Sequence, residues 1–182
     1  MKRIAALVAS ILAGSSAGFA QTPPPPAAVT ETVPDTTIPP IPLGEEPVDP
    51  YEVSNANAGA KPLAGTEMLE AFHGREGISR IVEHLVRANA DDRRLAGIFV
   101  ASDMVRLRRI LFEQFCYILN GGCDYTGRDM KSTHADHGGT VADFSAVVEN
   151  LQDAMDAEGV ATWAQNRFLA KLAPMKRDIV VR

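Results

Sequence analysis

The sequence predicts an all-helical domain in the C-terminal part of a 182-residue chain. Apolar residues recur there at steps of three and four, which is typical of one face of an α-helix. Residues of the capping type precede these stretches, and glycines follow them. No stretch shows the sustained two-residue alternation of a strand. We therefore expect several helices joined by short turns.

Two long helices are expected in the first half of this domain. The apolar stripe of the earlier one is formed by Ile78, Ile81, Val82, Leu85 and Val86. The later one begins at a capping residue, Ser102 or Asp103, and ends before the glycine pair at 121–122. Its stripe is formed by Met104, Leu107, Leu111, Phe115 and Ile118.

Two more helices follow. Thr140 and Asp143 have the spacing of a capping box and begin a third helix, which ends at Gly159. The last helix contains Trp163, Phe168, Leu169 and Leu172, and Pro174 is expected to kink it.

Two segments precede the helical domain. Residues 1–20 have the layout of a secretory signal peptide: two basic residues, a short apolar run, and the cleavage pattern Gly18-Phe19-Ala20. Residues 21–65 are acidic, contain eleven of the twelve prolines, and have few bulky apolar residues, so we expect a disordered linker there. The linker is a solvated spacer or a ligand for a proline-binding partner. The helical domain is residues 66–182, and the protein is expected to be periplasmic or secreted.

Charge and hydropathy exclude two classes of protein. The formal net charge is -5, and the stretch between Arg3 and Lys61 has six acidic and no basic residues. A nucleic-acid binder needs a basic surface for phosphate contacts, so no nucleic-acid partner is expected. No apolar run reaches the roughly 18 residues that a membrane span needs.

The stretch between the second and third long helices suggests a function. The sequence has no glycine-rich phosphate loop, no Gly-x-Ser-x-Gly and no histidine pair at ligand spacing. It has instead an ordered set of features: Phe99 after Asp91-Asp92, Gly121-Gly122, Tyr125-Thr126-Gly127, Met130, His134, Phe144, and the ending Ala173-Pro174-Met175-Lys176. From about Met68 to Val181 this set resembles the group I truncated haemoglobins. The resemblance implies a two-over-two helical sandwich, the truncated globin fold.

The resemblance also implies a haem b cofactor, with His134 at the position of the proximal iron ligand. A neutral imidazole is a natural axial ligand for haem iron and leaves the opposite face open to a diatomic gas. Covalent c-type attachment is not expected, because there is no Cys-x-x-Cys-His. The other residues expected to contact haem are Phe99, Leu107, Leu111, Phe115, Tyr125, Met130, Phe144 and Val147.

The distal side departs from the family pattern. Well-known members often carry a Tyr in the first long helix and a Gln in the distal helix, and both donate hydrogen bonds to oxygen. These positions fall on Val86, Leu107 and Leu111, which are all apolar. A hydrogen bond to a partly charged acceptor contributes about 1.5–3 kcal/mol, so its loss should speed oxygen release about ten- to a hundredfold. We expect selectivity to shift toward carbon monoxide and nitric oxide.

Four other polar residues are alternatives at this site. His137 lies three residues after His134 and is expected at the surface or at the edge that holds the haem propionates. Gln114, Tyr117 and His84 are expected at the surface or the rim rather than in a distal role.

The two cysteines are relevant to the cellular compartment in which the protein is expected. Cys116 lies near the end of the distal helix and Cys123 just past the glycine turn. In an oxidising periplasm they can form a disulfide, which we favour over two reduced buried thiols.

Three functions follow from these observations. The first is a haem protein that binds oxygen, nitric oxide or carbon monoxide for storage, transport, sensing or electron transfer, with an unidentified reductase as electron donor. The second is an enzyme that oxidises nitric oxide with oxygen. The third is a haem-free helical interaction module.

Overall fold

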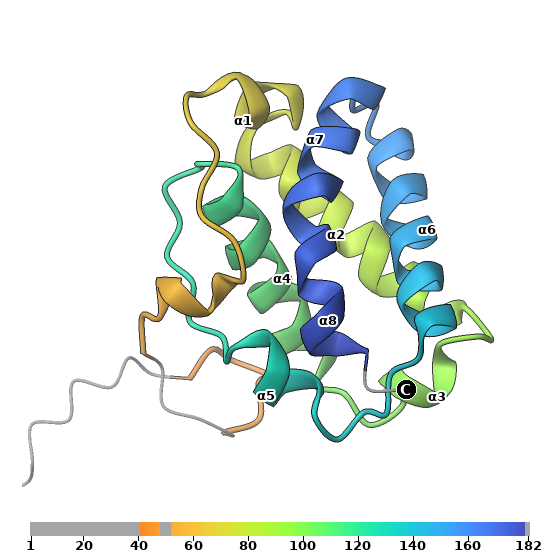
Figure 1. Ribbon diagram of the computed structural model, residues 1–182. Coiled ribbons are helices and arrows are strands. Elements are labelled where there is room, and N and C mark those ends of the chain that lie inside the picture. The colour runs from red at the N-terminus through yellow and green to blue at the C-terminus, as the bar shows by residue number, and fades with distance from the viewer. Residues whose placement is uncertain (1–40, 48–51, 181–182) are drawn as a thin grey trace, which may run out of the picture. The chain divides into compact units, whose positions relative to one another are not determined.

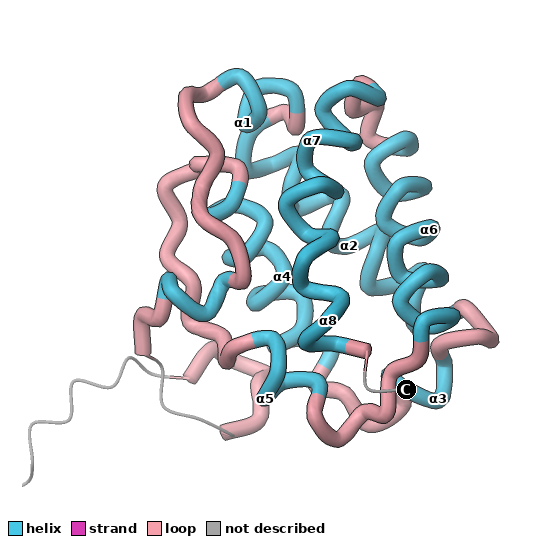
Figure 2. The backbone as a smooth tube through the Cα atoms, viewed as in Figure 1, coloured by secondary structure: helices cyan, strands magenta, loops and turns pink. Residues whose placement is uncertain are grey.

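The computed structural model describes residues 41–47 and 52–180, and all regular elements in these two ranges are helices (Figure 2). The predicted all-helical fold class is confirmed. The predicted signal peptide and the first part of the predicted linker lie outside the described residues. No helix within these ranges is long and apolar enough to cross a membrane.

Four long helices form two layers. Figure 1 shows α6 (Val141–Ala157) and α7 (Thr162–Leu172) in front of α2 (Gly74–Asp91) and α4 (Met104–Ile118). The shorter elements are η1 (Asn55–Ala58), α1 (Glu67–Ala71), α3 (Ala96–Phe99), α5 (Met130–His134), η2 (Ala173–Met175) and α8 (Lys176–Ile179).

The core lies where α2 meets α4 and α6. The predicted stripe of α2 is buried, with Ile78, Ile81 and Leu85 at most 2% exposed. Phe168 of α7 packs edge-to-face against both Phe72 and Phe115, with ring centroids 5.1 and 5.0 Å apart. Burial of aromatic rings in this geometry stabilises a core beyond the area it removes from water.

The predicted helix ends agree with the structure. The Asp103 side chain caps α4 by accepting hydrogen bonds from the backbone N–H groups of Val105 and Arg106. Thr140 and Asp143 form the capping box of α6. Asn120 follows the end of α4 in the left-handed region, with φ of 62°, which asparagine tolerates better than most residues. Pro174 marks the change from α7 to the 3-10 helix η2.

The predicted linker needs a correction. Residues 52–65 pack on the helical domain rather than standing free of it, and Ala58 and Leu63 belong to the buried residues. The Leu63 N–H donates to the carbonyl oxygen of Ile118, at the end of α4. Proline content gave no sign of this packing, because it depends on a few backbone hydrogen bonds and small apolar side chains. This part of the predicted linker is therefore packed, while the predicted bounds of the helical domain stay a prediction.

We predict that Asp103→Ala lowers the free energy of unfolding by about 1 kcal/mol at neutral pH, because α4 loses its cap. Backbone hydrogen bonds from Arg106 and Glu46 hold the pKa of Asp103 below its ordinary value of 3.8. A carboxylate with a lowered folded-state pKa stabilises the fold above pH 3.8, and this stabilisation is lost as the pH falls through the lower value. The difference between the parent protein and the variant should therefore shrink in acid. Urea unfolding measures it, with the exposed Asp136→Ala as control. An equal difference at pH 7 and pH 2 would contradict the assignment.

Candidate functional site

A cavity with two connected lobes lies between the helical layers. The inner lobe has a volume of about 310 Å³ and the outer lobe about 220 Å³. Both lobes are lined by Leu85, Leu107, Leu111, Thr133, His134, Phe144, Val147 and Ile179. These residues come from α2, α4, α5, α6 and α8, so the cavity is a product of the whole fold.

The two lobes differ in chemistry. The inner lobe is lined mainly by aliphatic and aromatic side chains and thioethers, among them Phe115, Met130 and Met175. The outer lobe adds polar groups from Asn89, Ser102, His137, Thr140 and Asp143. The cavity therefore suits a mainly apolar molecule that carries polar groups at one end.

His134 is held in a defined orientation. It lies at the end of α5, a short helix that Asp129 caps by accepting a hydrogen bond from the Ser132 N–H. Its ring Nδ1 lies 2.7 Å from the carbonyl oxygen of Met130, one turn earlier. A carbonyl oxygen can only accept, so Nδ1 carries the proton and donates. In the neutral ring this leaves Nε2 with a lone pair, as required of a metal ligand.

The surroundings of His134 favour the neutral ring. Burial lowers the pKa of His134 below its usual value, since a charged imidazolium loses hydration in the cavity. The hydrogen bond to Met130 acts in the opposite direction, and the nearby His137 lowers the pKa slightly further. The ring centroids of His134 and His137 are 6.1 Å apart. A neutral imidazole is available at neutral pH without the loss of a proton.

The other residues predicted to contact haem all line this cavity: Phe99, Leu107, Leu111, Phe115, Tyr125, Met130, Phe144 and Val147. The Tyr125 hydroxyl is not directed to a guest, because it donates to the carbonyl oxygen of Arg128 at 3.1 Å. Burial raises the pKa of Tyr125 to about 12, so this hydroxyl stays protonated. Every residue predicted to contact haem thus lines the cavity, and the role in haem binding stays a prediction.

The prediction for Val86 is wrong. Val86 is fully buried in the core and lines neither lobe, whereas Leu85 lines both. One residue along an α-helix turns the side chain by about 100°, so an alignment error of one position exchanges the cavity wall for the core. Leu85 is apolar as well, so Leu85, Leu107 and Leu111 offer no hydrogen-bond donor, whereas Gln114 on α4 brings an amide to the inner lobe. Leu85 and Val86 belong to the same apolar stripe, so the sequence pattern alone did not distinguish them.

The four alternative polar residues lie in different places in the structure. His137 lines the outer lobe, as expected of an edge residue. Tyr117 lines neither lobe, and His84 faces a separate polar groove between α2 and α6. Gln114 was expected at the surface or rim, but it is 5% exposed and lines the inner lobe. Its Nε2 donates to the carbonyl oxygen of Ala58 at 3.0 Å.

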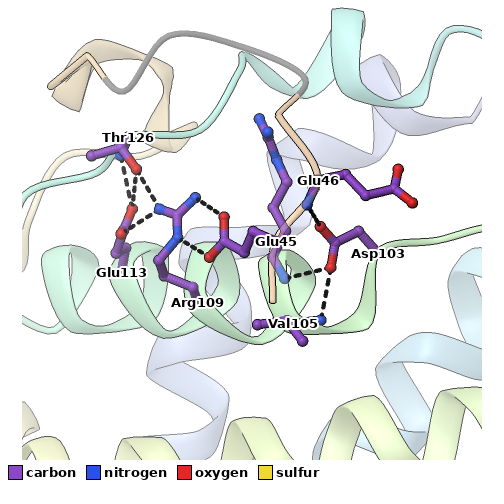
Figure 3. Close-up of polar contacts among 8 residues, drawn as sticks. Glu45, Glu46, Asp103, Val105, Arg109, Glu113 and Thr126 are labelled. Atoms are coloured by element: carbon purple, nitrogen blue, oxygen red, sulfur yellow. Dashed lines mark hydrogen bonds and ion pairs between the residues drawn. The ribbon is translucent and has the colours of Figure 1, made fainter. Parts of the chain in front are cut away.

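A disulfide and a group of polar contacts join α4 to the loop that leads to α5. Cys116 and Cys123 form a disulfide that closes the turn after α4. On the back of α4, Arg109 binds Glu113 and the Thr126 hydroxyl, each at 2.6 Å, while Glu113 accepts from both the Thr126 N–H and its hydroxyl (Figure 3). The helix carrying Leu107 and Leu111 is thus tied to the segment carrying His134.

Comparison with known proteins identifies the family. Residues 67–181 match the bacterial-like globin family. Over 113 residues, the chain is 34% identical to the group 1 truncated haemoglobin GlbN of Mycolicibacterium paratuberculosis, covering 62% of this chain and 82% of that protein. The GlbN of Nostoc commune is 31% identical over the same length, with 96% of it covered. The chain belongs to the group 1 truncated haemoglobins.

Solved structures agree with the fold of this truncated haemoglobin. The truncated haemoglobin of Tetrahymena pyriformis in its Fe(III) form superposes with a TM-score of 0.60 at 20% identity, over 63% of this chain and 98% of that chain. The 2/2 haemoglobin of Synechococcus sp. PCC 7002 superposes with a TM-score of 0.58 at 21% identity. The predicted two-over-two globin fold is confirmed. Membership of this family implies a haem cofactor and a gas ligand.

We predict that replacing both cysteines, as Cys116→Ala with Cys123→Ala, lowers the free energy of unfolding by about 2–3 kcal/mol on the chain-entropy account of a short loop. Urea unfolding of the parent protein, the variant and the dithiothreitol-treated parent protein measures this. The reduced parent and the variant should agree. Two alkylatable thiols in the unreduced protein would contradict the disulfide.

Proposed function

We propose that this truncated haemoglobin binds haem b through His134 and holds a small diatomic gas on the opposite, apolar side of the cavity. The observation that carries the proposal is the hydrogen bond from His134 Nδ1 to the Met130 carbonyl oxygen. It fixes the ring, keeps Nε2 unprotonated, and does so inside a large apolar cavity.

The residues present fit haem. No group of three or more His, Cys, Asp or Glu residues among positions 41–47 and 52–180 is arranged to hold a metal ion by itself. A histidine with a free Nε2 in a mainly apolar cavity suits a cofactor that brings the other ligands of its metal. When bound, haem would supply an iron atom that can take a gas as a ligand.

The outer lobe supports the expected orientation of the cofactor carboxylates. His137 and Thr140 line this lobe. The Lys176 ammonium lies 5.7 Å from the centroid of the Phe144 ring, which lines both lobes. A cation and polar groups at this edge favour the haem propionates, while the apolar inner lobe favours the macrocycle.

The distal wall determines which gas is retained. Leu85, Leu107 and Leu111 line both lobes and offer no hydrogen-bond donor. Oxygen gains more than carbon monoxide or nitric oxide from such a donor, because it takes on more negative charge when it binds. We therefore propose rapid oxygen release and selectivity toward carbon monoxide and nitric oxide. Oxidation of nitric oxide by oxygen is disfavoured, since that reaction requires oxygen to remain bound.

The location and the electron donor complete the proposal. We place the protein in the periplasm or outside the cell, supported by the signal-peptide pattern of residues 1–20 and by the disulfide of Cys116 and Cys123. A reductase or small electron carrier would keep the iron in the ferrous state that carbon monoxide and oxygen require.

We predict that the purified chain, titrated with haem, gives a Soret band with one haem per chain, and that His134→Ala loses this band or shifts it. Added imidazole should restore the band in His134→Ala, because the free ligand replaces the missing side chain. His84→Ala is the matched control, since His84 faces the separate groove. The absence of a Soret band in the parent chain would contradict haem binding, and the haem-free interaction module would then be the remaining function. Loss of the band in His137→Ala but not in His134→Ala would contradict the choice of ligand.

We predict that Leu111→Gln slows oxygen dissociation about ten- to a hundredfold, because it adds a donor worth about 1.5–3 kcal/mol next to the gas. Stopped-flow displacement of oxygen by carbon monoxide measures the rate. Val105→Gln is the control, because Val105 lies on the same helix and is 44% exposed. Equal rates in Leu111→Gln and in the parent protein would show that position 111 does not face the gas.

A further inference from the structure

Two described stretches before the family-matched region, residues 41–47 and 52–65, contact α4, the helix that carries the distal wall. We call residues 41–47 and 52–65 the brace. Its contacts follow α4 from its first turn to its end. They are Glu46 N–H to Asp103 Oδ2 at 2.7 Å, Glu45 to Arg109, Ala58 carbonyl oxygen to Gln114 Nε2, and Leu63 N–H to the Ile118 carbonyl oxygen at 2.8 Å.

Glu45 makes the strongest of these contacts. Its side chain is 1% exposed, and its two carboxylate oxygens accept from Arg109 Nε at 2.6 Å and Nη2 at 3.0 Å (Figure 3). A two-fold contact of this kind is directional as well as charged. A buried carboxylate is costly without its partner, so Glu45 holds the brace firmly to the back of α4.

Ala58 and Gly59 contact two residues of the cavity wall. Ala58 is fully buried, and its carbonyl oxygen accepts from Gln114, which lines the inner lobe. A side chain at Gly59 would place a Cβ atom 2.7 Å from Cε of Met175, which also lines the inner lobe. The brace therefore packs directly behind two residues of the cavity wall.

The same segment is tied to the proximal side. The Ser54 N–H donates to the carbonyl oxygen of Tyr125 at 2.7 Å, and the Tyr125 N–H donates to Asn55 Oδ1 at 2.7 Å. Asn55 Nδ2 donates to Asp124 Oδ1 at 2.9 Å. Tyr125 lies in the loop between α4 and α5 and lines the inner lobe. The brace thus spans the distal helix and the loop that leads to His134.

We propose that the brace holds the distal wall in place and sets the rate at which a gas reaches and leaves the cavity, with Glu45 as a positioning residue. This inference rests on the proposed gas binding. A gas enters a buried cavity when the surrounding elements move apart for a moment, and the frequency of such openings depends on the free energy of the local displacement. Each contact between the brace and α4 raises that free energy, so the brace slows gas exchange.

The test compares two neighbouring residues in the full chain. Glu45→Ala removes the contact with Arg109, which keeps Glu113 as a partner, and Glu45→Gln preserves the shape of the side chain. Glu46→Ala is the matched control: its side chain is exposed, and its backbone N–H, which binds Asp103, is unchanged. Carbon monoxide association after flash photolysis reports gas access. Hydrogen exchange of the brace and α4 amides, with and without haem, reports release of the brace.

In Glu45→Ala we expect carbon monoxide association to become about fivefold faster, which corresponds to about 1 kcal/mol, the net contribution of one such contact. Exchange of the brace amides should accelerate in the same variant, Glu45→Gln should lie between it and the parent protein, and Glu46→Ala should change neither. An unchanged association rate while the brace amides exchange faster would overturn the inference, and so would unchanged exchange. Both results leave the proposed function intact. Absence of a Soret band in the parent chain would overturn the proposed function, and this inference with it.

Discussion

The hydrogen bond between His134 Nδ1 and the Met130 carbonyl oxygen is the interaction on which the site depends. It gives the ring one tautomer and one orientation, and burial in the cavity keeps the ring uncharged. The rest of the fold supplies the conditions for that state. Apolar residues from five helices enclose a cavity of two lobes, and a charged imidazole would be poorly solvated there. In the proposed function, the same packing supplies both the ligand for iron and the apolar surroundings of the macrocycle.

Helix α4 has two functions, on two of its faces. Leu107 and Leu111 line the cavity, whereas Arg109 faces Glu45 on the other side (Figure 3). In our proposals, the inner face determines what a bound gas contacts, and the outer face determines how firmly that surface is held. The disulfide from Cys116 adds a covalent link to the loop before α5. Distal and proximal sides are therefore fixed relative to one another by the same helix.

The long helices were predictable because their apolar residues follow the helical repeat and their caps have a sequence signature. The capping box at Thr140 is an example. The prediction of His134 as a ligand required the ordered family motifs, since a single histidine in a sequence does not by itself indicate a metal ligand. The sequence placed Val86 in the cavity wall, one residue away from Leu85, which lines it. An alignment without gaps can be off by one position, and one position changes the face of the helix on which a residue lies. The packing of Glu45 was not predictable, because its partner lies 64 residues away and no repeat connects them.

The apolar distal wall around the gas is the central claim, and the oxygen dissociation rate of the unmodified ferrous protein tests it most directly. Group members with a distal Tyr and Gln retain oxygen through hydrogen bonds, whereas Leu85, Leu107 and Leu111 offer none. We predict a rate about ten- to a hundredfold faster than in those members, from the loss of a hydrogen bond of about 1.5–3 kcal/mol. A rate as slow as theirs would contradict the account.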